Sequence, residues 1–130
     1  MEHHKQLIRD AFAAVIENPQ YDETAIRRYF SPDYVQQVDG KILSFDQFRQ
    51  HMKVLKETVS AVAVHFDTLA AENEIVFSNH RVTASRSDGQ TGEMQVIAEF
   101  HIHNGQINYC NELTHLIKGD AEDRDLGSRH

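Results

Sequence analysis

Apolar side chains in the first half of the chain recur every three or four residues, the spacing of one helix face. The first such run ends at Asn18-Pro19, and the second ends before Ser31-Pro32, because the residue that precedes proline disfavours the helical conformation. Ser44 directly precedes the third run and is expected to cap it. The predicted helices cover residues 5–17, 21–30 and 45–57.

Beyond Glu57 the pattern changes to short β-prone runs. Their connectors are rich in Asn, Asp and Gly, which predicts antiparallel hairpins, and Asp39-Gly40 marks an earlier hairpin within residues 34–44. The predicted strands of the second half are 59–69, 74–86, 93–103 and 106–117. Helices followed by a meander indicate an α+β fold, with three N-terminal helices packed in a curved antiparallel sheet that leaves a hollow at one end.

Composition agrees with one folded domain: 130 residues, 40% of them hydrophobic and 25% charged. We expect this domain to span residues 1–118, followed by a polar, acidic tail at 119–130. The 20 acidic residues outnumber the 13 basic ones, and no Lys/Arg cluster occurs, so nucleic acid is not an expected partner. The sequence contains one cysteine, no leader pattern and no long apolar span, which predicts a cytoplasmic protein without a membrane partner.

Strand alternation assigns the side chains of the last two strands to faces. An unbroken apolar set on residues 94–102 is expected to line the hollow, so His101 and His103 should lie on the outer face. Two imidazoles at this spacing could bind a metal ion, but the following glutamate does not match the spacing of cupin-type sites. A subunit interface is the alternative, and no metal site is predicted. On the last strand the same alternation assigns one set to the pocket: Ile107, Tyr109, Asn111, Leu113 and His115.

Other residues of chemical interest have ordinary structural explanations beside the functional ones. His80 could be a pocket base but is interpreted as a hydrogen-bonded sheet residue, and His51 could reach the pocket mouth or cover an apolar stripe. Cys110 has no adjacent base in its strand, so a nucleophilic role is not expected. Phosphate-binding glycine loops, nucleophile elbows and Cys-x-x-Cys pairs do not occur in the sequence, and no cofactor is predicted.

Two stretches, YFSPDYVQQVDGKILSFDQFRQHM (29–52) and AEFHIHNGQINYCNELTHLI (98–117), resemble the nuclear-transport-factor-two-like superfamily and, within it, the SnoaL-like proteins. The resemblance extends over roughly residues 5–118. It implies a conical α+β fold with a pocket between sheet and helices, and often a second subunit packed on the sheet. Superfamily members include isomerases, polyketide cyclases, epoxide hydrolases, dehydratases and non-enzymatic binding modules, so the fold does not choose a reaction.

The matched positions disfavour ketosteroid isomerase chemistry, because Phe12, Gln37 or Val38, and Ala98 stand where the acid and base groups would be. Asp39 would reach the base position after a shift of one residue, but its place in the hairpin turn explains it better. The late position of SnoaL-like cyclases falls near His115, which is the predicted acid/base. The predicted ligand-binding residues are Phe12, Tyr34, Gln37, His51, Tyr109 and Asn111.

Two functional hypotheses follow. The first is a SnoaL-like protein that binds a small apolar ligand, with proton-transfer chemistry of the isomerase, cyclase or dehydratase type on a polyketide-like or steroid-like substrate if it is an enzyme. The second is a non-catalytic ligand-binding or protein-interaction module with the same pocket. A homodimer formed through the sheet is expected in either case.

Overall fold

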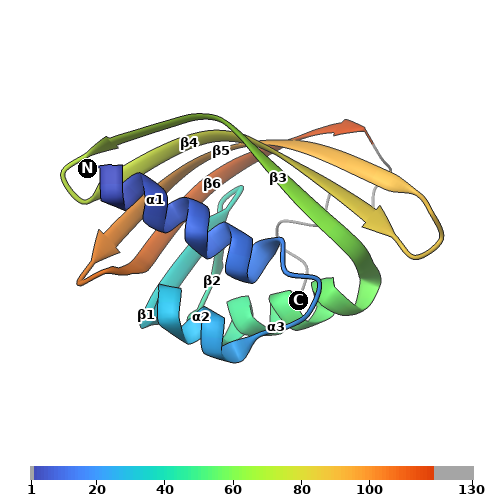
Figure 1. The fold of residues 1–130 in the computed structure, drawn as a ribbon, viewed down its shortest axis with the longest axis horizontal. Helices are drawn as coiled ribbons and strands as arrows, with labels where there is room; N and C mark the ends of the chain where they lie inside the picture. Colours follow the sequence, from blue (N-terminus) through green and yellow to red (C-terminus); the bar gives the residue numbers. More distant parts are fainter. Residues whose placement is uncertain (1, 119–130) are drawn as a thin grey trace.

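The computed structural model describes residues 2–118, and the tail predicted at 119–130 lies outside the described residues. Three helical segments and six strands form the fold. The predicted α+β class is confirmed. The helices are α1 (Glu2–Ala11), which continues into a π-helical segment η1 (Phe12–Ile16), α2 (Glu23–Tyr29) and α3 (Phe45–Thr58). The strands are β1 (Phe30–Val38), β2 (Lys41–Leu43), β3 (Val59–Glu72), β4 (Ile75–Arg86), β5 (Thr91–His103) and β6 (Gln106–Lys118). Figure 1 shows the helices together on one side of the curved sheet.

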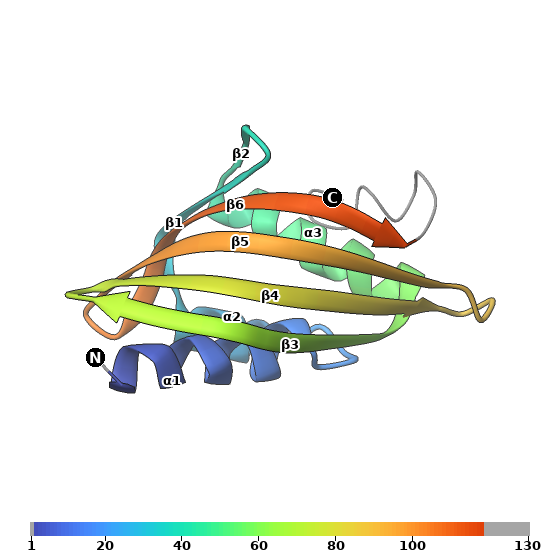
Figure 2. The same ribbon diagram turned by 90° about the horizontal axis from the view of Figure 1, so that it is seen from above.

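The sheet has the order β2-β1-β6-β5-β4-β3 and remains open between β2 and β3 (Figure 2). The four long strands β3 to β6 form the predicted antiparallel meander. In one respect the prediction of a wholly antiparallel sheet is wrong, because β1 pairs in parallel with β6 and the sheet is mixed. This pairing joins segments that lie far apart in the sequence, so local hairpin signals could not reveal it.

Local sequence explains where the helices begin. The Ser44 side chain accepts a hydrogen bond from the Gln47 amide, and the Gln47 side chain accepts one from the Ser44 amide, which is a complete capping box for α3. Asp22 caps α2 by accepting from the Ala25 amide. Strand β1 begins at Phe30, directly after α2, so Ser31-Pro32 lies inside this strand and not in a loop between helix and strand.

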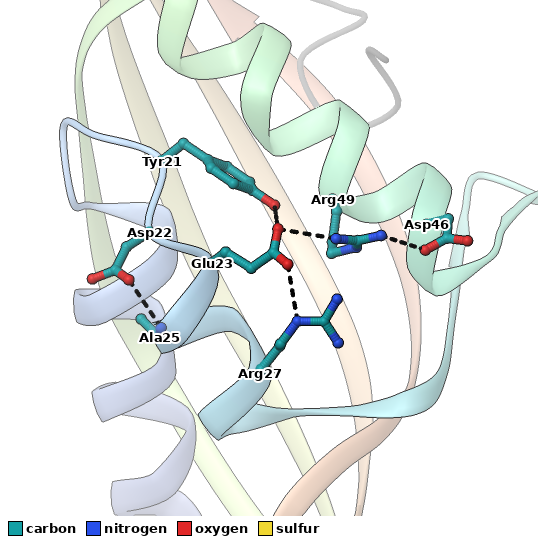
Figure 3. Close-up of polar contacts among 7 residues, drawn as sticks. All are labelled: Tyr21, Asp22, Glu23, Ala25, Arg27, Asp46 and Arg49. Carbon is teal, nitrogen blue, oxygen red and sulfur yellow. Dashed lines mark hydrogen bonds and ion pairs between the residues drawn. The ribbon is translucent and has the colours of Figure 1, made fainter.

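A polar network joins α2 to α3 (Figure 3). The Glu23 carboxylate accepts hydrogen bonds from Arg27 and Arg49, each at 2.9 Å, and from the Tyr21 hydroxyl. Arg49 also donates to Asp46 at 2.6 Å. These donors, the Arg27 side chain first, lower the pKa of Glu23 to about 2. The network fixes the two helices relative to each other on the same side of the sheet.

Two tight turns follow the sequence signals. Asp39 and Gly40 between β1 and β2 both have positive φ angles, as have Asn104 and Gly105 between β5 and β6. Positive φ at both central residues is the requirement of the hairpin turn for which Asn-Gly and Asp-Gly are preferred. Both predicted hairpins are therefore confirmed.

The core fills the space between the helices and the concave face of the sheet. Ile8, Ile26, Phe48 and Ile107 are almost completely removed from solvent. Phe30, Tyr34 and Phe48 pack in edge-to-face or tilted arrangements with ring centroids 4.8–4.9 Å apart and join β1 to α3. Full burial of side chains of this size contributes about 1.5–3 kcal/mol each.

Candidate functional site

A cavity of about 100 Å³ lies between the concave face of the sheet and the helices. Most of its wall is apolar, with Phe12, Ile16, Phe48, Met52 and Leu55 from the helices and Phe30, Val62, Val82, Ala84, Met94, Val96 and Phe100 from the strands. The remaining lining residues are Tyr34, Gln36, His51, His80, Cys110, Glu112 and Thr114. An apolar hollow with a few polar groups is typical of sites that bind small molecules.

An irregularity in β6 decides which of its side chains reach the cavity. Ile102 of β5 pairs with Ile107, whereas His101 pairs with Tyr109, so Asn108 is an extra residue in β6. A one-residue bulge exchanges the faces of all residues that follow it, because side chains alternate along a strand. Beyond the bulge, the residues that line the cavity are Cys110, Glu112 and Thr114.

The bulge overturns the predicted positions of Tyr109, Asn111 and His115. Regular alternation from Ile107 placed them in the pocket, but the structure places them on the outer face, and none of the three lines the cavity. His115 pairs with Gln95 and is exposed. The geometry therefore gives His115 no contact with the cavity in which an acid/base role was predicted.

Gln37 also lies on the outer face, contrary to the prediction. Its side-chain oxygen accepts a hydrogen bond from the Tyr109 hydroxyl at 3.4 Å. Tyr34 and Gln36 are buried and line the cavity. Residues 34 and 37 are an odd number of positions apart and cannot share a face of a regular strand, so Gln36 and not Gln37 accompanies Tyr34. The predicted positions of Phe12, Tyr34 and His51 in the pocket wall agree with the structure.

Glu112 is the acidic residue of the cavity wall. Gln36 Nε2 donates to Glu112 Oε1 at 3.3 Å, and the Tyr34 hydroxyl donates to Gln36 Oε1 at 3.0 Å. The Cys110 sulfur lies 4.0 Å from Glu112 Oε2. The carboxyl group is thus oriented by a chain of uncharged side chains, and no cation is among these contacts.

Burial raises the pKa of Glu112 to about 7, because the charged form loses water in the apolar cavity. The negative charge of Asp39 adds to this increase, and the hydrogen bond from Gln36 opposes it. Burial also raises the pKa values of the Tyr34 hydroxyl and the Cys110 thiol well above their ordinary ranges. Near neutral pH, Glu112 therefore exchanges its proton while the hydroxyl and the thiol keep theirs.

Asp39 supports this end of the cavity from the β1–β2 turn. Its amide donates to the Glu112 carbonyl at 2.9 Å, and its carboxylate accepts from the Thr114 amide at 2.8 Å and from the Thr114 hydroxyl. These contacts hold the turn against β6 at Glu112 and Thr114. Asp39 thus has a structural role in addition to its place in the hairpin turn.

His80 provides a second polar group in the wall, on β4. Its Nδ1 lies 2.8 Å from the Ser78 hydroxyl, and the ring packs edge-on against Phe12 at 5.2 Å between centroids. Burial lowers the pKa of His80 to about 4, although the negative charge of Asp67 opposes the decrease. The imidazole is therefore neutral at physiological pH.

The outer face carries the histidines that drew attention in the sequence. His101 Nε2 contacts Glu99 Oε2 at 2.5 Å, and its ring packs against Tyr109. His101 and His103 lie on the opposite side of the sheet from the cavity, as alternation predicted. Within residues 2–118, no group of three or more His, Cys, Asp or Glu side chains is placed to hold a metal ion.

Sequence reasoning missed Glu112 and Gln36 as cavity residues. The side chains of β6 alternate between two faces, and each of the two sets contains both apolar and polar residues. The sequence pattern therefore did not show which set is buried. The pattern of β5 was a usable signal, because its apolar set is unbroken and Ala98 stands directly opposite Glu112. The composition of β6 does not reveal a bulge, however, so the residue of β6 that faces Ala98 could not be found by counting from the turn at Asn104-Gly105.

Comparison with known structures defines the class of fold. An LEH-like epoxide hydrolase of Mycobacterium tuberculosis superposes with a TM-score of 0.75 at 13% identity, over 98% of this chain and 90% of that one. AclR, a proposed hydroxylase from Streptomyces galilaeus, gives 0.75 at 19% identity over 88% and 76% of the two chains. IdmH, a proposed polyketide cyclase from Streptomyces antibioticus, gives 0.74 at 12% identity over 85% and 91%. The protein has the nuclear-transport-factor-two-like α+β fold.

Sequence comparison identifies the family. Residues 8–109 match the model of the SnoaL-like domain, and the chain belongs to this family. An uncharacterised protein of Schizosaccharomyces pombe is 32% identical over 107 residues, which cover 82% of each chain. Within residues 2–118, none of the helices combines the length and the apolar character needed to cross a bilayer.

Proposed function

We propose that the cavity binds a small, largely apolar molecule and that Glu112 transfers a proton to or from it. The observation that carries this proposal is a carboxyl group with a pKa of about 7 in the wall of an apolar cavity. A group that titrates near the working pH is present in both forms, so it can accept a proton and return it. Gln36 orients the carboxyl group through its hydrogen bond to Oε1.

The reaction class is proton abstraction beside a carbonyl group. The Glu112 carboxylate takes the proton from the carbon next to the carbonyl, and the C–H electron pair forms a carbon–carbon double bond while the carbonyl oxygen takes the negative charge. Return of the proton to the same or another carbon gives exchange or isomerisation, and attack of the enolate on a second carbonyl gives cyclisation. Carbonyl-rich substrates of polyketide-like or steroid-like character agree with this chemistry and with the polyketide cyclase among the structural neighbours.

The test uses 2-indanone, a compact ketone with acidic hydrogens on both sides of its carbonyl, in D₂O. Replacement of these hydrogens by deuterium, followed by proton NMR, should be faster with the protein than with buffer, and the rate should rise with pH around a midpoint near 7. E112Q should lower the protein-catalysed rate about 100-fold or more, the size expected when a general base is removed.

E99Q is the matched control, because Glu99 lies on the neighbouring strand β5 but on the outer face, beside His101. Its exchange rate should equal that of the unchanged protein. Exchange that survives E112Q, or a rate without a pH midpoint near 7, would contradict the role of Glu112. Binding of 2-indanone without any catalysed exchange would favour the alternative, a non-catalytic ligand-binding module.

We also propose that the outer face of the sheet forms a homodimer. Val35, Phe77, Ile97 and Leu113, named here the outer apolar patch, are 36–64% exposed and come from four strands of this face. Ile97 and Leu113 are direct cross-strand partners. Exposed apolar patches of this kind commonly mark protein interfaces. A monomer at micromolar concentration in analytical ultracentrifugation would contradict the dimer.

A cytoplasmic location is proposed from the sequence pattern and is independent of the site.

A further inference from the structure

His80 has no part in the proton transfer proposed for Glu112, yet it is a polar side chain in the wall of the same cavity. The side chain is 1% exposed and belongs to the cavity lining. An imidazole in such a place requires hydrogen-bond partners, because an unsatisfied buried nitrogen is unfavourable.

The neighbours of His80 fix the orientation of its ring. Ser78, two residues earlier on the same face of β4, holds Nδ1 at 2.8 Å. Phe12 and Phe66 pack against the ring with centroids 5.2 and 5.3 Å away. A ring held at one nitrogen and packed by two aromatic side chains presents its other nitrogen, Nε2, in a defined direction.

The same contacts favour one tautomer of His80. Among residues 2–118, the Ser78 hydroxyl has no acceptor other than His80 Nδ1, and the tautomer with its proton on Nε2 is the one that lets this hydroxyl donate. No acceptor for Nε2 is found in the described part of the chain. The low pKa of His80 agrees with a neutral ring. In this tautomer the cavity wall contains an uncharged N–H donor for which the described residues supply no partner.

We propose that His80 is a ligand-binding residue that donates a hydrogen bond from Nε2 to an uncharged acceptor oxygen, such as a ketone carbonyl, of the molecule in the cavity. The inference rests on the proposed ligand-binding function and adds the chemistry of a second contact. A neutral donor in an apolar wall favours an uncharged oxygen, because a carboxylate ligand would lose its water without gaining a positive partner.

The sheet register places His80 and Glu112 at opposite sides of the cavity floor. Ser78 of β4 pairs with Ala98 of β5, and Ala98 pairs with Glu112 of β6. His80 lies one row further along, where it pairs with Val96 of β5, and Val96 pairs with Thr114 of β6. His80 and Glu112 therefore stand diagonally across β5, two strand spacings or about 10 Å apart in the direction across the strands. A flat molecule that lies over Val96 of β5 can therefore have its acceptor oxygen toward His80 and its reacting carbon toward Glu112.

The test compares two ligands of the same shape, 2-indanone and 2-methylideneindane, in which a CH₂ group replaces the carbonyl oxygen. Dissociation constants from NMR titration should favour the ketone about fivefold, the size expected for one net hydrogen bond. H80F should remove this preference. S78A should reduce it, because the proton then spreads over both nitrogens. H115F, the same substitution on the outer face, should keep it.

Nitrogen NMR of the unchanged protein gives a second readout that does not depend on how the variants fold. The His80 resonances should show a proton on Nε2 and none on Nδ1, and the Nε2–H signal should move when 2-indanone binds. A proton on Nδ1, equal affinities for the two ligands, an undiminished preference in H80F, or binding of neither ligand would each overturn the proposal. In E112Q the ketone preference should persist although exchange is lost, so failure of the Glu112 proposal is distinguishable from failure of this one.

Discussion

The two faces of the sheet carry the same kinds of residue in different surroundings. On the concave face, Glu112 and His80 stand in an apolar wall, and burial moves their pKa values to about 7 and about 4. On the outer face, Glu99 and His101 contact each other directly, with side chains 33% and 38% exposed. Contacts with this much solvent contribute little to stability even when both groups are charged, whereas a buried ionisable group changes both stability and reactivity. Residue type is therefore a poor guide to function here, and the face on which a residue lies is a good one.

Asn108, the extra residue of β6, determines which side chains of this strand face the cavity. Its deletion is the change with the largest expected effect on the difference between the two faces. Removal of Asn108 would turn Cys110, Glu112 and Thr114 outward in a regular strand, or force a new bulge elsewhere. We expect a loss of about 4 kcal/mol or more in the free energy of unfolding, measured by chemical denaturation, because a buried set of side chains is exchanged for an outer one.

A glycine inserted after Gln20, in the exposed connection before α2, is the control for a change of one residue in chain length. It should change the free energy of unfolding by less than about 1 kcal/mol, since lengthening a surface loop has a small entropic effect. A deletion variant as stable as the unchanged protein would show that the bulge does not fix the faces of β6.

Glu112 gives the next largest effect. Its pKa rises from 4.5 to about 7 on folding, so between these pH values the folded state holds a proton that the unfolded state has lost, and stability falls as the pH increases. The destabilisation is absent below pH 4.5 and complete above pH 7, where it reaches up to about 3 kcal/mol. E112Q should remove it, so the variant should gain stability at pH 8 and not at pH 4. Unfolding curves at the two pH values measure this, and an equal change at both would refute the assignment.

His80 should show the opposite pH dependence, of a similar size. Its pKa falls from 6.5 to about 4 on folding, so stability is lost as the pH decreases through this window, by up to about 3 kcal/mol. H80F should lack this acid-side loss, whereas H101F on the outer face should keep it. The pH dependence of the unfolding free energy between 4 and 6.5 separates the two variants, and a matching profile for both would argue against a buried neutral His80.

The smallest effect on folding is expected from the outer apolar patch. Leu113 is 64% exposed, so L113E should change the unfolding free energy of a monomer by less than about 0.5 kcal/mol. In the proposed dimer the same charge would lie in the interface, and sedimentation should shift toward the monomer. T68E, on the outer edge strand β3 away from the patch centre, serves as a surface control that should leave the assembly state unchanged. Unaltered sedimentation of a dimeric L113E variant would place the interface elsewhere.

Much of the architecture is encoded locally and could be predicted from the sequence. Ser44 and Gln47 define the start of α3, and Asp39-Gly40 and Asn104-Gly105 define two hairpins, because caps and tight turns depend on a few neighbouring residues. The unbroken apolar set of β5 identified its buried face correctly. Phe12, Tyr34 and His51 lie in the pocket wall as predicted, and Phe12 was placed there from its match to a position of the family.

The tertiary structure decided what local pattern could not. The parallel pairing of β1 with β6 joins residues far apart in the chain, and the bulge at Asn108 is visible only in the pairing of β6 with β5. Because of that single extra residue, Glu112 faces the cavity and the predicted His115 does not. Loss of water in the cavity raises the pKa of the Glu112 carboxyl group. The amino-acid sequence by itself determined the elements, the fold class and the apolar hollow, since these follow from short-range periodicity. Which acid or base faces the hollow depends on strand register and burial, and both are properties of the assembled sheet.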